Sequence, residues 1–333
     1  MMKRSIGVIC GLLAVQLVAF AQEQQFANLG DFKLQNGGVI RNCRIGYRTF
    51  GTLNSDKSNV IVFPTWAGGT TEQLKSNFGP GRLIDSTTYY VVAIDALSNG
   101  VSSSPSNSRL QPRMRFPKFS LRDTVATQHE LLTRVLNIHH VKAVVGISMG
   151  GMQAFQWLVS YPDFMEKAIP IVGSPRLAPY DLMLWQAQIS ALMRDRDWKG
   201  GNYTVNPARA LDFAFGELLL TTPADYNRRK TREQVFADLE KARNDAHRFD
   251  ANDKIRQVQA MMQLDISRDA AKTVKAKVLV VVAKYDHVVT PGPATEFATL
   301  LGAKLLTLDS DCGHLSTTCE SSHLNEAVAN FLK

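Results

Sequence analysis

Residues 146–150 read Gly-Ile-Ser-Met-Gly, so Ser148 lies between two glycines. The apolar, β-branched run from Val141 to Ile147 before it is typical of a strand, and the segment from Gly151 to Val159 after it can form a helix. A Gly-x-Ser-x-Gly segment that joins a strand to a helix forms a nucleophile elbow, which turns the chain sharply and exposes the serine hydroxyl. The pattern therefore predicts a nucleophilic serine. A glycine-rich turn without chemistry is the alternative.

A serine hydroxyl attacks a carbonyl group only when a base takes its proton and an acid orients that base. In elbow-type enzymes these groups follow one another in the order serine, acid, histidine. Asp286 follows the apolar run from Lys277 to Val282, and His314 follows the next run, from Lys304 to Leu308. Both would lie just after the carboxyl end of a strand. We therefore predict a catalytic triad of Ser148, Asp286 and His314.

Each partner of the serine also has a purely structural alternative. Asp286 could cap a helix that begins near Pro291, and His314 could be an ordinary loop histidine. Rival acids and bases occur in the same region: Asp309, Asp311, His287 and His323. We rank the two rival acids lower because they lie too close in sequence to His314 for triad geometry, and both rival bases rank below His314.

The negative charge that develops on the carbonyl oxygen needs backbone donors, each of which contributes roughly 2.7 to 4 kcal/mol. The amide of Met149, directly after the nucleophile at a helix start, is one candidate. The second is expected in the loop at residues 64–69, Pro-Thr-Trp-Ala-Gly-Gly, from the amide of Trp66 or Ala67. A plain glycine turn is the alternative for this loop.

These residues need a scaffold that brings several strand ends together. Dense apolar runs, typical of parallel strands covered on both faces, lie at residues 59–63, 89–94, 141–147, 168–172, 277–282 and 304–308. Helical patterns lie at residues 121–136, 293–301 and 322–331, and an antiparallel hairpin is expected within residues 26–51. Alternation of strands with helices predicts the α/β class, with a mostly parallel, doubly wound central sheet.

The segment from Pro175 to Arg268 has no strand pattern and is rich in Leu, Ala, Met, Arg and Asp. This composition predicts a helical insertion. We therefore expect an α/β core from residues 22–174 and 269–333 and a helical lid from residues 175–268. A chain of 333 residues is long enough for one large domain with such an insertion.

The first 21 residues have the organisation of a secretory signal peptide. Lys3 and Arg4 form a basic start, Ile6 to Val18 is apolar, and Ala19-Phe20-Ala21 is a small-x-small cleavage pattern. We predict cleavage after Ala21 and export to the periplasm or the medium. An uncleaved membrane anchor is the alternative, although the apolar run is shorter than the roughly 20 residues that span a bilayer. A lipid anchor on Cys10 is less favoured.

Three cysteines remain after the predicted cleavage. Cys312 and Cys319 flank the predicted catalytic histidine and could form a disulfide, which persists outside the cytosol, or remain two free thiols. Cys43 has no obvious partner. The chain has no Cys-x-x-Cys or comparable cluster, so we expect neither a metal nor a cofactor.

The formal net charge of +8 includes the basic residues of the predicted signal. The remaining basic residues are dispersed or mixed with acids, and the densest run is only Arg228-Arg229-Lys230. Such a pattern is typical of solvated helices and argues against nucleic-acid or anionic-membrane binding. The expected partner is a small molecule, an ester or acyl donor.

Residues 146–154, Gly-Ile-Ser-Met-Gly-Gly-Met-Gln-Ala, followed by Trp157 and Tyr161-Pro162, resemble the elbow of the homoserine O-acetyltransferase family of α/β-hydrolases. Similar segments extend the resemblance over most of the predicted mature chain: Gly79-Pro80-Gly81, Leu121-Arg122-Asp123, residues 168–171 and Asp197-Trp198. The resemblance implies the α/β-hydrolase fold, an acyl-serine intermediate and a helical lid that is often used for dimerisation. It places the triad roles on Ser148, Asp286 and His314.

The departures from that family concern the substrate. The acetyltransferases have an aspartate after the catalytic histidine, which helps to hold the homoserine amine, where this chain has Leu315. The family arginine that meets the homoserine carboxylate aligns between Phe215 and Thr221, where no arginine occurs. We therefore assign substrate contacts to Phe215 and Leu315. An unpaired buried charge costs roughly 3 to 5 kcal/mol, so this site is not expected to hold a zwitterion.

The sequence thus predicts an exported serine hydrolase that acts on short-chain acyl esters with an apolar alcohol part. An O-acyltransferase that uses the same acyl-enzyme is the first alternative, because sequence does not show whether water or another acceptor reaches it. A non-enzymatic binding protein that keeps the fold is the second.

Overall fold

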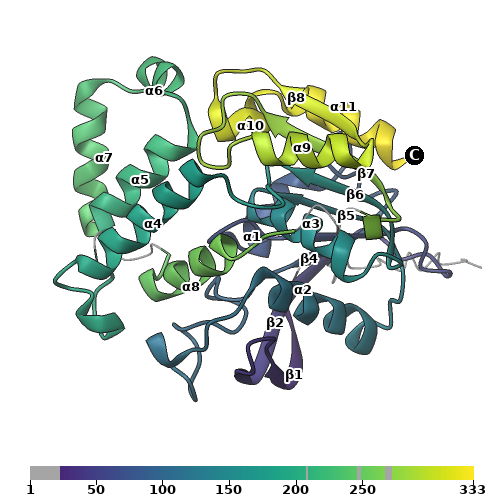
Figure 1. The fold of residues 1–333 in the computed structure, drawn as a ribbon, viewed down its shortest axis with the longest axis horizontal. Coiled ribbons are helices and arrows are strands. Elements are labelled where there is room, and N and C mark those ends of the chain that lie inside the picture. The colour runs from purple at the N-terminus through teal and green to yellow at the C-terminus, as the bar shows by residue number, and fades with distance from the viewer. Residues whose placement is uncertain (1–22, 208, 246–248, 267–271) are drawn as a thin grey trace, which may run out of the picture.

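The computed structural model describes residues 23–207, 209–245, 249–266 and 272–333, so the predicted signal at residues 1–21 lies outside the described part. Its centre is an eight-stranded sheet in the order β1-β2-β4-β3-β5-β6-β7-β8 (Figure 1). The strands are β1 (Gln25–Lys33), β2 (Val39–Phe50), β3 (Val60–Pro64), β4 (Tyr90–Ile94), β5 (Val141–Ile147), β6 (Met165–Ile171), β7 (Lys277–Ala283) and β8 (Lys304–Leu308). Strands β3 to β8 pair in parallel, and the antiparallel β1–β2 hairpin joins the sheet along β4.

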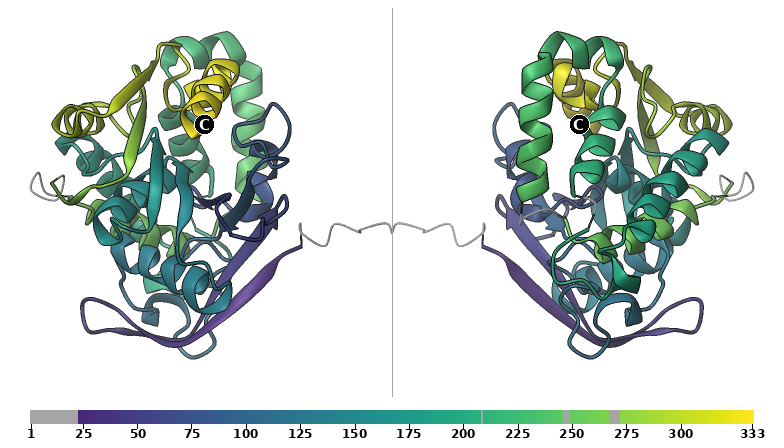
Figure 2. Two further views of the ribbon diagram at one scale, coloured as in Figure 1. Left: turned by 90° about the vertical axis from the view of Figure 1, so that its right-hand side faces the viewer. Right: turned by 90° about the vertical axis from the view of Figure 1, so that its left-hand side faces the viewer.

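Helices bury both faces of this sheet, as the nearly continuous apolar strands require. On one face pack α2 (Leu121–Glu130), α3 (Met149–Ser160) and α9 (Gly292–Leu301), whose apolar side chains share a core with those of β5 and β7. On the other face pack α1 (Thr71–Leu74) and α11 (Ser321–Leu332). The two side views show these layers and the twist of the sheet between them (Figure 2). The predicted α/β class with a mostly parallel sheet is confirmed.

The described residues between β6 and β7 include the α-helices α4 (Pro179–Arg194), α5 (Arg209–Leu220), α6 (Pro223–Arg229), α7 (Arg232–Asn244) and α8 (Ala251–Met262). The ends of the insertion meet, because the amide of Ile266 donates to the carbonyl of Pro175 at 2.9 Å. Helices α4 to α7 extend beside the sheet in Figure 1. The apolar side of α8, including the fully buried Ile255 and Ala260, belongs to the main core, as do Trp185, Ile189 and Leu192 of α4.

The strands and helices follow the predicted pattern closely, with one change of helix type. The strands at residues 141–147 and 304–308 have the expected bounds. The predicted helix at residues 121–136 is α-helical only to Glu130 and continues as a π-helical turn from Leu131 to Val135. Apolar periodicity does not distinguish these two types over a single turn.

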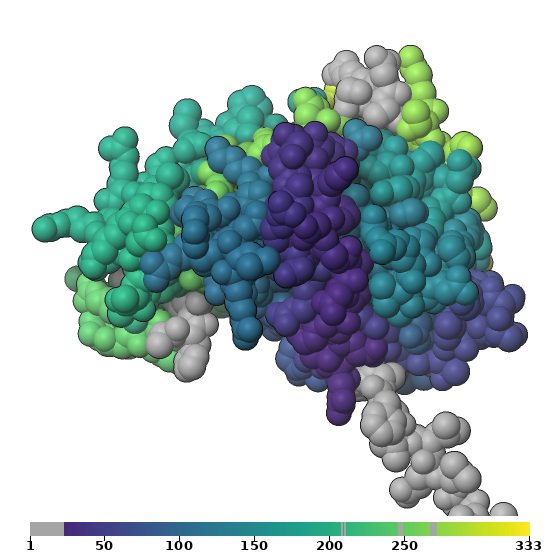
Figure 3. Space-filling view, turned by 90° about the horizontal axis from the view of Figure 1, so that it is seen from below, coloured from purple at the N-terminus to yellow at the C-terminus, as the bar shows by residue number. Residues whose placement is uncertain are grey.

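The β1–β2 hairpin forms a strip across the face of the molecule seen in Figure 3, with the helical insertion on one side. Its outer edge is irregular, because the register between β1 and β2 shifts around Gly30. None of the helices in the described residues is long and apolar enough to cross a membrane.

Candidate active site

Ser148 lies in a sharp turn between β5 and α3. Its backbone has φ 59° and ψ −120°, and its amide donates to the carbonyl of Ile171 at 2.9 Å. Neither flanking glycine leaves room for a side chain. A Cβ atom at Gly146 would lie 2.3 Å from the backbone of Gly150, and one at Gly150 would lie 2.6 Å from the carbonyl oxygen of Pro64. The turn therefore has the geometry of a nucleophile elbow, which holds the serine in a strained conformation.

The structure brings the three predicted triad residues together. The Nε2 atom of His314 lies 2.9 Å from the Oγ atom of Ser148, and its Nδ1 atom lies 2.5 Å from Oδ2 of Asp286. His314 is 6% exposed and Asp286 is 4% exposed. These contacts form a continuous path from the hydroxyl through the imidazole to a buried carboxylate. Such a path allows the imidazole to take the serine proton and the carboxylate to orient the ring.

Hydrogen bonds within its own loop hold the carboxylate of Asp286, and a residue of the insertion binds the same loop. Its Oδ1 atom accepts from the amides of Val288 and Val289, each at 3.0 Å. The next residue, Thr290, donates from its amide and its hydroxyl to the carboxylate of Asp181 in α4. Asp181 is fully buried, and burial raises the pKa of its carboxyl, with a smaller contribution from the charge of Asp286. Helix α4 therefore anchors the loop that carries the acid.

The rival acids and bases have other partners. Asp309 pairs with Lys284, and Asp311 pairs with Arg228. His287 contacts the carbonyl of Leu218 at 2.9 Å, whereas His323 lies 3.5 Å from Glu320. In the described residues these four side chains contact neither Ser148 nor His314.

The loop after β3, residues 64–69, which we call the oxyanion loop, lies beside the nucleophile. Three of its amides are already used: Thr65 donates to Ile94, Gly68 to Oε1 of Gln257, and Gly69 to Trp66. Within the described part of the chain, the amides of Trp66 and Ala67 donate to no acceptor, nor does that of Met149 at the start of α3. These predicted donors are thus available to a ligand, and the geometry does not choose between Trp66 and Ala67.

Buried amide side chains fix the oxyanion loop. Gln257 of α8 accepts from Gly68 at 2.8 Å and donates to the carbonyl of Leu97 at 2.9 Å. Gln153 of α3 donates to the carbonyl of Thr65 at 3.0 Å. Sequence reasoning missed both glutamines. Gln153 lies within the quoted elbow segment, whereas Gln257 carries no local signal because it contacts a loop 189 residues earlier.

A cavity of about 1210 Å³ opens over Ser148 and His314. Apolar side chains of the insertion and of the acid loop line one part of it: Trp185, Leu219, Val258, Met261, Val288 and Val289. A charged pair, Lys254 and Asp212, also lines it, with side chains only 17% and 14% exposed. The cavity is thus large enough for a substrate well beyond the size of an acetyl group.

Only one of the two predicted substrate contacts lies at this cavity. Leu315 lines it beside His314, but Phe215 does not. The prediction for Phe215 is therefore corrected to Phe213 and Gly216, which line the cavity from the same helix, α5. The reason is helical geometry: the cavity-lining residues of α5 share one face, and Phe215 lies just beyond the edge of that face.

Cys312 and Cys319, which flank His314 in the sequence, form a disulfide with each other. Of the two predicted possibilities, a disulfide or two free thiols, the structure has the disulfide. Cys43 is a buried free thiol in β2, and burial raises its pKa to about 12. Among the described residues, Asp225, Asp311 and Cys312 are the one group of acidic and sulfur ligands close enough to hold a metal ion. Because the sulfur is in the disulfide and arginines bind both carboxylates, this group is a poor metal site.

A sequence profile of the α/β hydrolase fold matches residues 59–317. The chain is 36% identical over 181 residues to a probable esterase of Corynebacterium glutamicum and 35% identical over 190 residues to the ethyl acetate hydrolase of Pseudomonas veronii. These segments cover 54% and 56% of this chain and 52% and 54% of the two relatives. The match therefore spans about half the length of each relative.

A longer match exists to the homoserine O-acetyltransferase of Chlorobaculum tepidum, at 30% identity over 335 residues that cover 92% of this chain and 94% of that protein. Among solved structures, an acetylester hydrolase from Corynebacterium glutamicum superposes with a TM-score of 0.85 at 27% identity, covering 93% of this chain and 95% of the other. Proteins with this architecture thus include both ester hydrolases and acetyltransferases.

Proposed function

Because the chain belongs to the homoserine O-acetyltransferase-like family of α/β-hydrolases, we propose that it is a serine-dependent hydrolase of carboxylic esters with short acyl groups. The observation that carries the proposal is the path from Ser148 through His314 to the buried Asp286, beside amides that have no acceptor among the described residues. Relatives named as a probable esterase and an ethyl acetate hydrolase support the reaction class.

The geometry supplies each step of a two-stage hydrolysis. His314 Nε2 takes the proton of Ser148 as its Oγ atom bonds to the ester carbon, and the amides of Met149 and the oxyanion loop stabilise the resulting oxyanion. When the carbon–oxygen bond to the alcohol breaks, His314 gives the proton to the departing alkoxide. Water then loses a proton to His314 and attacks the acyl-serine, and the acid leaves as the proton returns to Ser148.

The substrate is a neutral ester with an apolar alcohol part. Leu315 stands beside His314, and apolar side chains line much of the cavity. Lys254 and Asp212, two of the charged residues on the lining, are paired with each other, and Arg82, Glu217 and Asp245 line the cavity as well. The support for an ester rather than homoserine as substrate is therefore the apolar Leu315 beside His314.

Transfer of the acyl group to an alcohol or thiol is the second candidate function, favoured by the 30% identity to a homoserine O-acetyltransferase over nearly the whole chain. The same acyl-serine would serve both reactions, and only the second nucleophile differs. Product analysis with a panel of acceptor alcohols and thiols separates them. Formation of new esters in place of free acid would favour transfer, and free acid throughout would favour hydrolysis.

We further propose export to the periplasm or the medium and a homodimer formed through the lid. The predicted signal at residues 1–21 and the disulfide between Cys312 and Cys319 support export. Exposed apolar side chains on the insertion, such as Tyr180 and Met183 of α4, support association. Expression of the full chain, cell fractionation and N-terminal sequencing would test export. An uncleaved protein retained in the cytoplasm would contradict it.

A panel of neutral esters with acyl chains of increasing length tests the proposed activity. Wild type should hydrolyse the short-chain esters, Ser148→Ala should lose at least about a hundredfold in kcat, and Ser190→Ala should match wild type. Ser190 is a suitable control because it lies on α4 and binds Gln186 rather than the triad. Absence of ester turnover across the panel, or equal turnover by Ser148→Ala, would overturn the proposal.

A further inference from the structure

The loop that carries His314, residues 309–320, rests against the insertion at the start of α6. We call it the histidine loop. The hydroxyl of Thr222 donates to the backbone carbonyl of Asp311 at 2.5 Å. Gly313 has φ +63°, and a Cβ atom there would lie 3.3 Å from the backbone of Thr221 and Thr222. The backbone beside the catalytic histidine is therefore in direct contact with the junction between α5 and α6.

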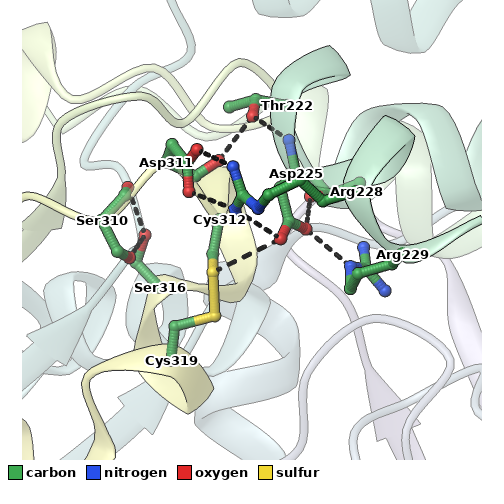
Figure 4. A network of polar contacts seen from close by, with 10 residues as sticks. Thr222, Asp225, Arg228, Arg229, Ser310, Asp311, Cys312, Ser316 and Cys319 are labelled. Carbon is green, nitrogen blue, oxygen red and sulfur yellow. Dashed lines mark hydrogen bonds and ion pairs between the residues drawn. A yellow bond between two sulfur atoms is a disulfide. The ribbon is translucent and has the colours of Figure 1, made fainter.

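A bidentate ion pair between Arg228 and Asp311 joins the histidine loop to the C-terminal end of α6. Both Nη atoms of Arg228 donate to the two carboxylate oxygens of Asp311, at 2.5 and 2.7 Å (Figure 4). The pair lowers the pKa of Asp311, chiefly through the hydrogen bond from Arg228. A guanidinium that binds both oxygens fixes direction as well as distance, which a single contact does not.

Asp225 organises the side of α6 that faces this loop. Its carboxylate is only 6% exposed and accepts from the hydroxyl of Thr221, from Arg229 Nε at 2.8 Å and from Arg228 Nη2 at 3.2 Å. These bonds hold its pKa below the ordinary value, with the bond from Thr221 as the largest cause. Asp225 thereby aims Arg228 at Asp311 (Figure 4).

The histidine loop is also braced from within. The disulfide joins Cys312 to Cys319, and the hydroxyl of Ser316 donates to the carbonyl of Gly313 at 2.7 Å. Internal bonds fix the shape of the loop but not its position relative to Ser148. Contacts from α6 and its N-cap act from outside the loop, on Asp311, three positions before His314.

We propose that Arg228 and Asp225 are positioning residues that hold His314 in register with Ser148 through Asp311. This inference rests on the proposed serine chemistry and extends it to a helix of the lid. Catalytic groups must be held within about 0.5 Å of their productive positions, and a 1 Å displacement can cost roughly a hundredfold in rate. Disturbance of α6 is therefore expected to change the chemical step rather than the affinity for the ester.

The test compares Arg228→Gln, Asp311→Asn and the double variant with wild type. Both side chains are about half exposed, so the variants should fold, and their thermal unfolding is recorded as a check. We expect kcat, and the rate at which a fluorophosphonate modifies Ser148, to fall about 5- to 20-fold, with KM within about twofold of wild type. The double variant should lose no more than either single variant, because the two side chains act as one unit.

Arg243→Gln is the matched control, because Arg243 forms an ion pair with Glu240 within α7, at side chains 65% and 63% exposed. It should retain wild-type rates. Unchanged kcat in Arg228→Gln, or a rise in KM alone, would overturn the positioning role while the proposed function stands. A wild-type protein that neither turns over esters nor reacts with the fluorophosphonate would instead overturn the proposed function and this inference with it.

Discussion

Gln257 supports the oxyanion loop through its buried side-chain amide. Its side chain joins the amide of Gly68 to the carbonyl of Leu97, and it is 1% exposed. Gly68 directly follows the two residues whose amides are open to a ligand. Loss of this bridge should let those amides drift from the position that the oxyanion needs.

The variant Gln257→Leu is therefore expected to lower kcat for a good ester substrate roughly tenfold, which is less than the loss of a whole donor. Steady-state kinetics measure the effect. Gln263→Leu is the control, since Gln263 lies just past the end of α8 and its side chain, within the described residues, donates to the carbonyl of Gln259. Equal kcat values for Gln257→Leu and wild type would show that the loop holds its shape without the bridge.

At the residue scale, the sequence predicted the triad partners because each follows a recognisable apolar strand. The sequence did not identify the second backbone amide for the oxyanion, because that identity depends on which amides of the oxyanion loop already have acceptors. The resemblance places a substrate contact at Phe215, whereas the face of α5 toward the cavity presents Phe213 and Gly216. A one-residue error moves a side chain by about 100° around a helix.

At the scale of elements, the disulfide closes the histidine loop around the catalytic base. Cys312 and Cys319 are 7 residues apart, and a crosslink over such a short loop stabilises a protein by about 2 to 3 kcal/mol. The double variant Cys312→Ala with Cys319→Ala should therefore have a lower Tm and a lower kcat than wild type. Thermal unfolding and ester kinetics measure both. Intact mass before and after reduction and alkylation should show one crosslink in wild type, and two free thiols at these positions would contradict the account.

Helix α8 carries a buried carboxyl group that makes stability depend on pH. Asp253 accepts from the amide and hydroxyl of Ser106, and burial, with a smaller contribution from Asp250, raises its pKa to about 8. Between about pH 4 and pH 8, the unfolded chain loses this proton while the folded protein keeps it. The free energy of unfolding should therefore fall as pH rises through this range.

The variant Asp253→Asn should remove this part of the pH dependence, because the amide is neutral at every pH and retains an acceptor for Ser106. We expect its Tm to decline less than that of wild type between pH 5 and pH 8.5. Thermal unfolding at fixed ionic strength across this range is the measurement. Parallel curves for the two proteins would mean that Asp253 does not keep its proton in the folded state.

The sequence indicated the insertion and its helical content, but not how its helices contact the core. α8 packs into the main core, α4 anchors the acid loop through Asp181, and α6 anchors the histidine loop. The last two contacts join residues 109 and 89 positions apart. Local periodicity predicts where helices form, but such distant pairs depend on the assembled packing.

At the scale of the whole molecule, the proposed homodimer would cover exposed apolar side chains of the insertion. Met183 is 73% exposed and Tyr180 is 57% exposed, both on α4. If these side chains lie in a homodimer interface, Met183→Glu should shift the protein toward the monomer, because dimer formation would then bury the glutamate charge. Light scattering after size-exclusion chromatography measures the mass. Leu110→Glu, at an exposed position outside the lid, is the control, and a monomeric wild type would contradict the dimer.

The central claim is that Ser148 is a nucleophile activated by His314. Labelling with a fluorophosphonate, followed by proteolysis and mass spectrometry, tests it most directly because the adduct forms only on an activated serine. The account predicts one adduct in wild type, on the peptide that contains Ser148, and labelling slowed at least about a hundredfold in His314→Ala. An adduct on another residue, or no adduct on folded wild-type protein, would contradict it.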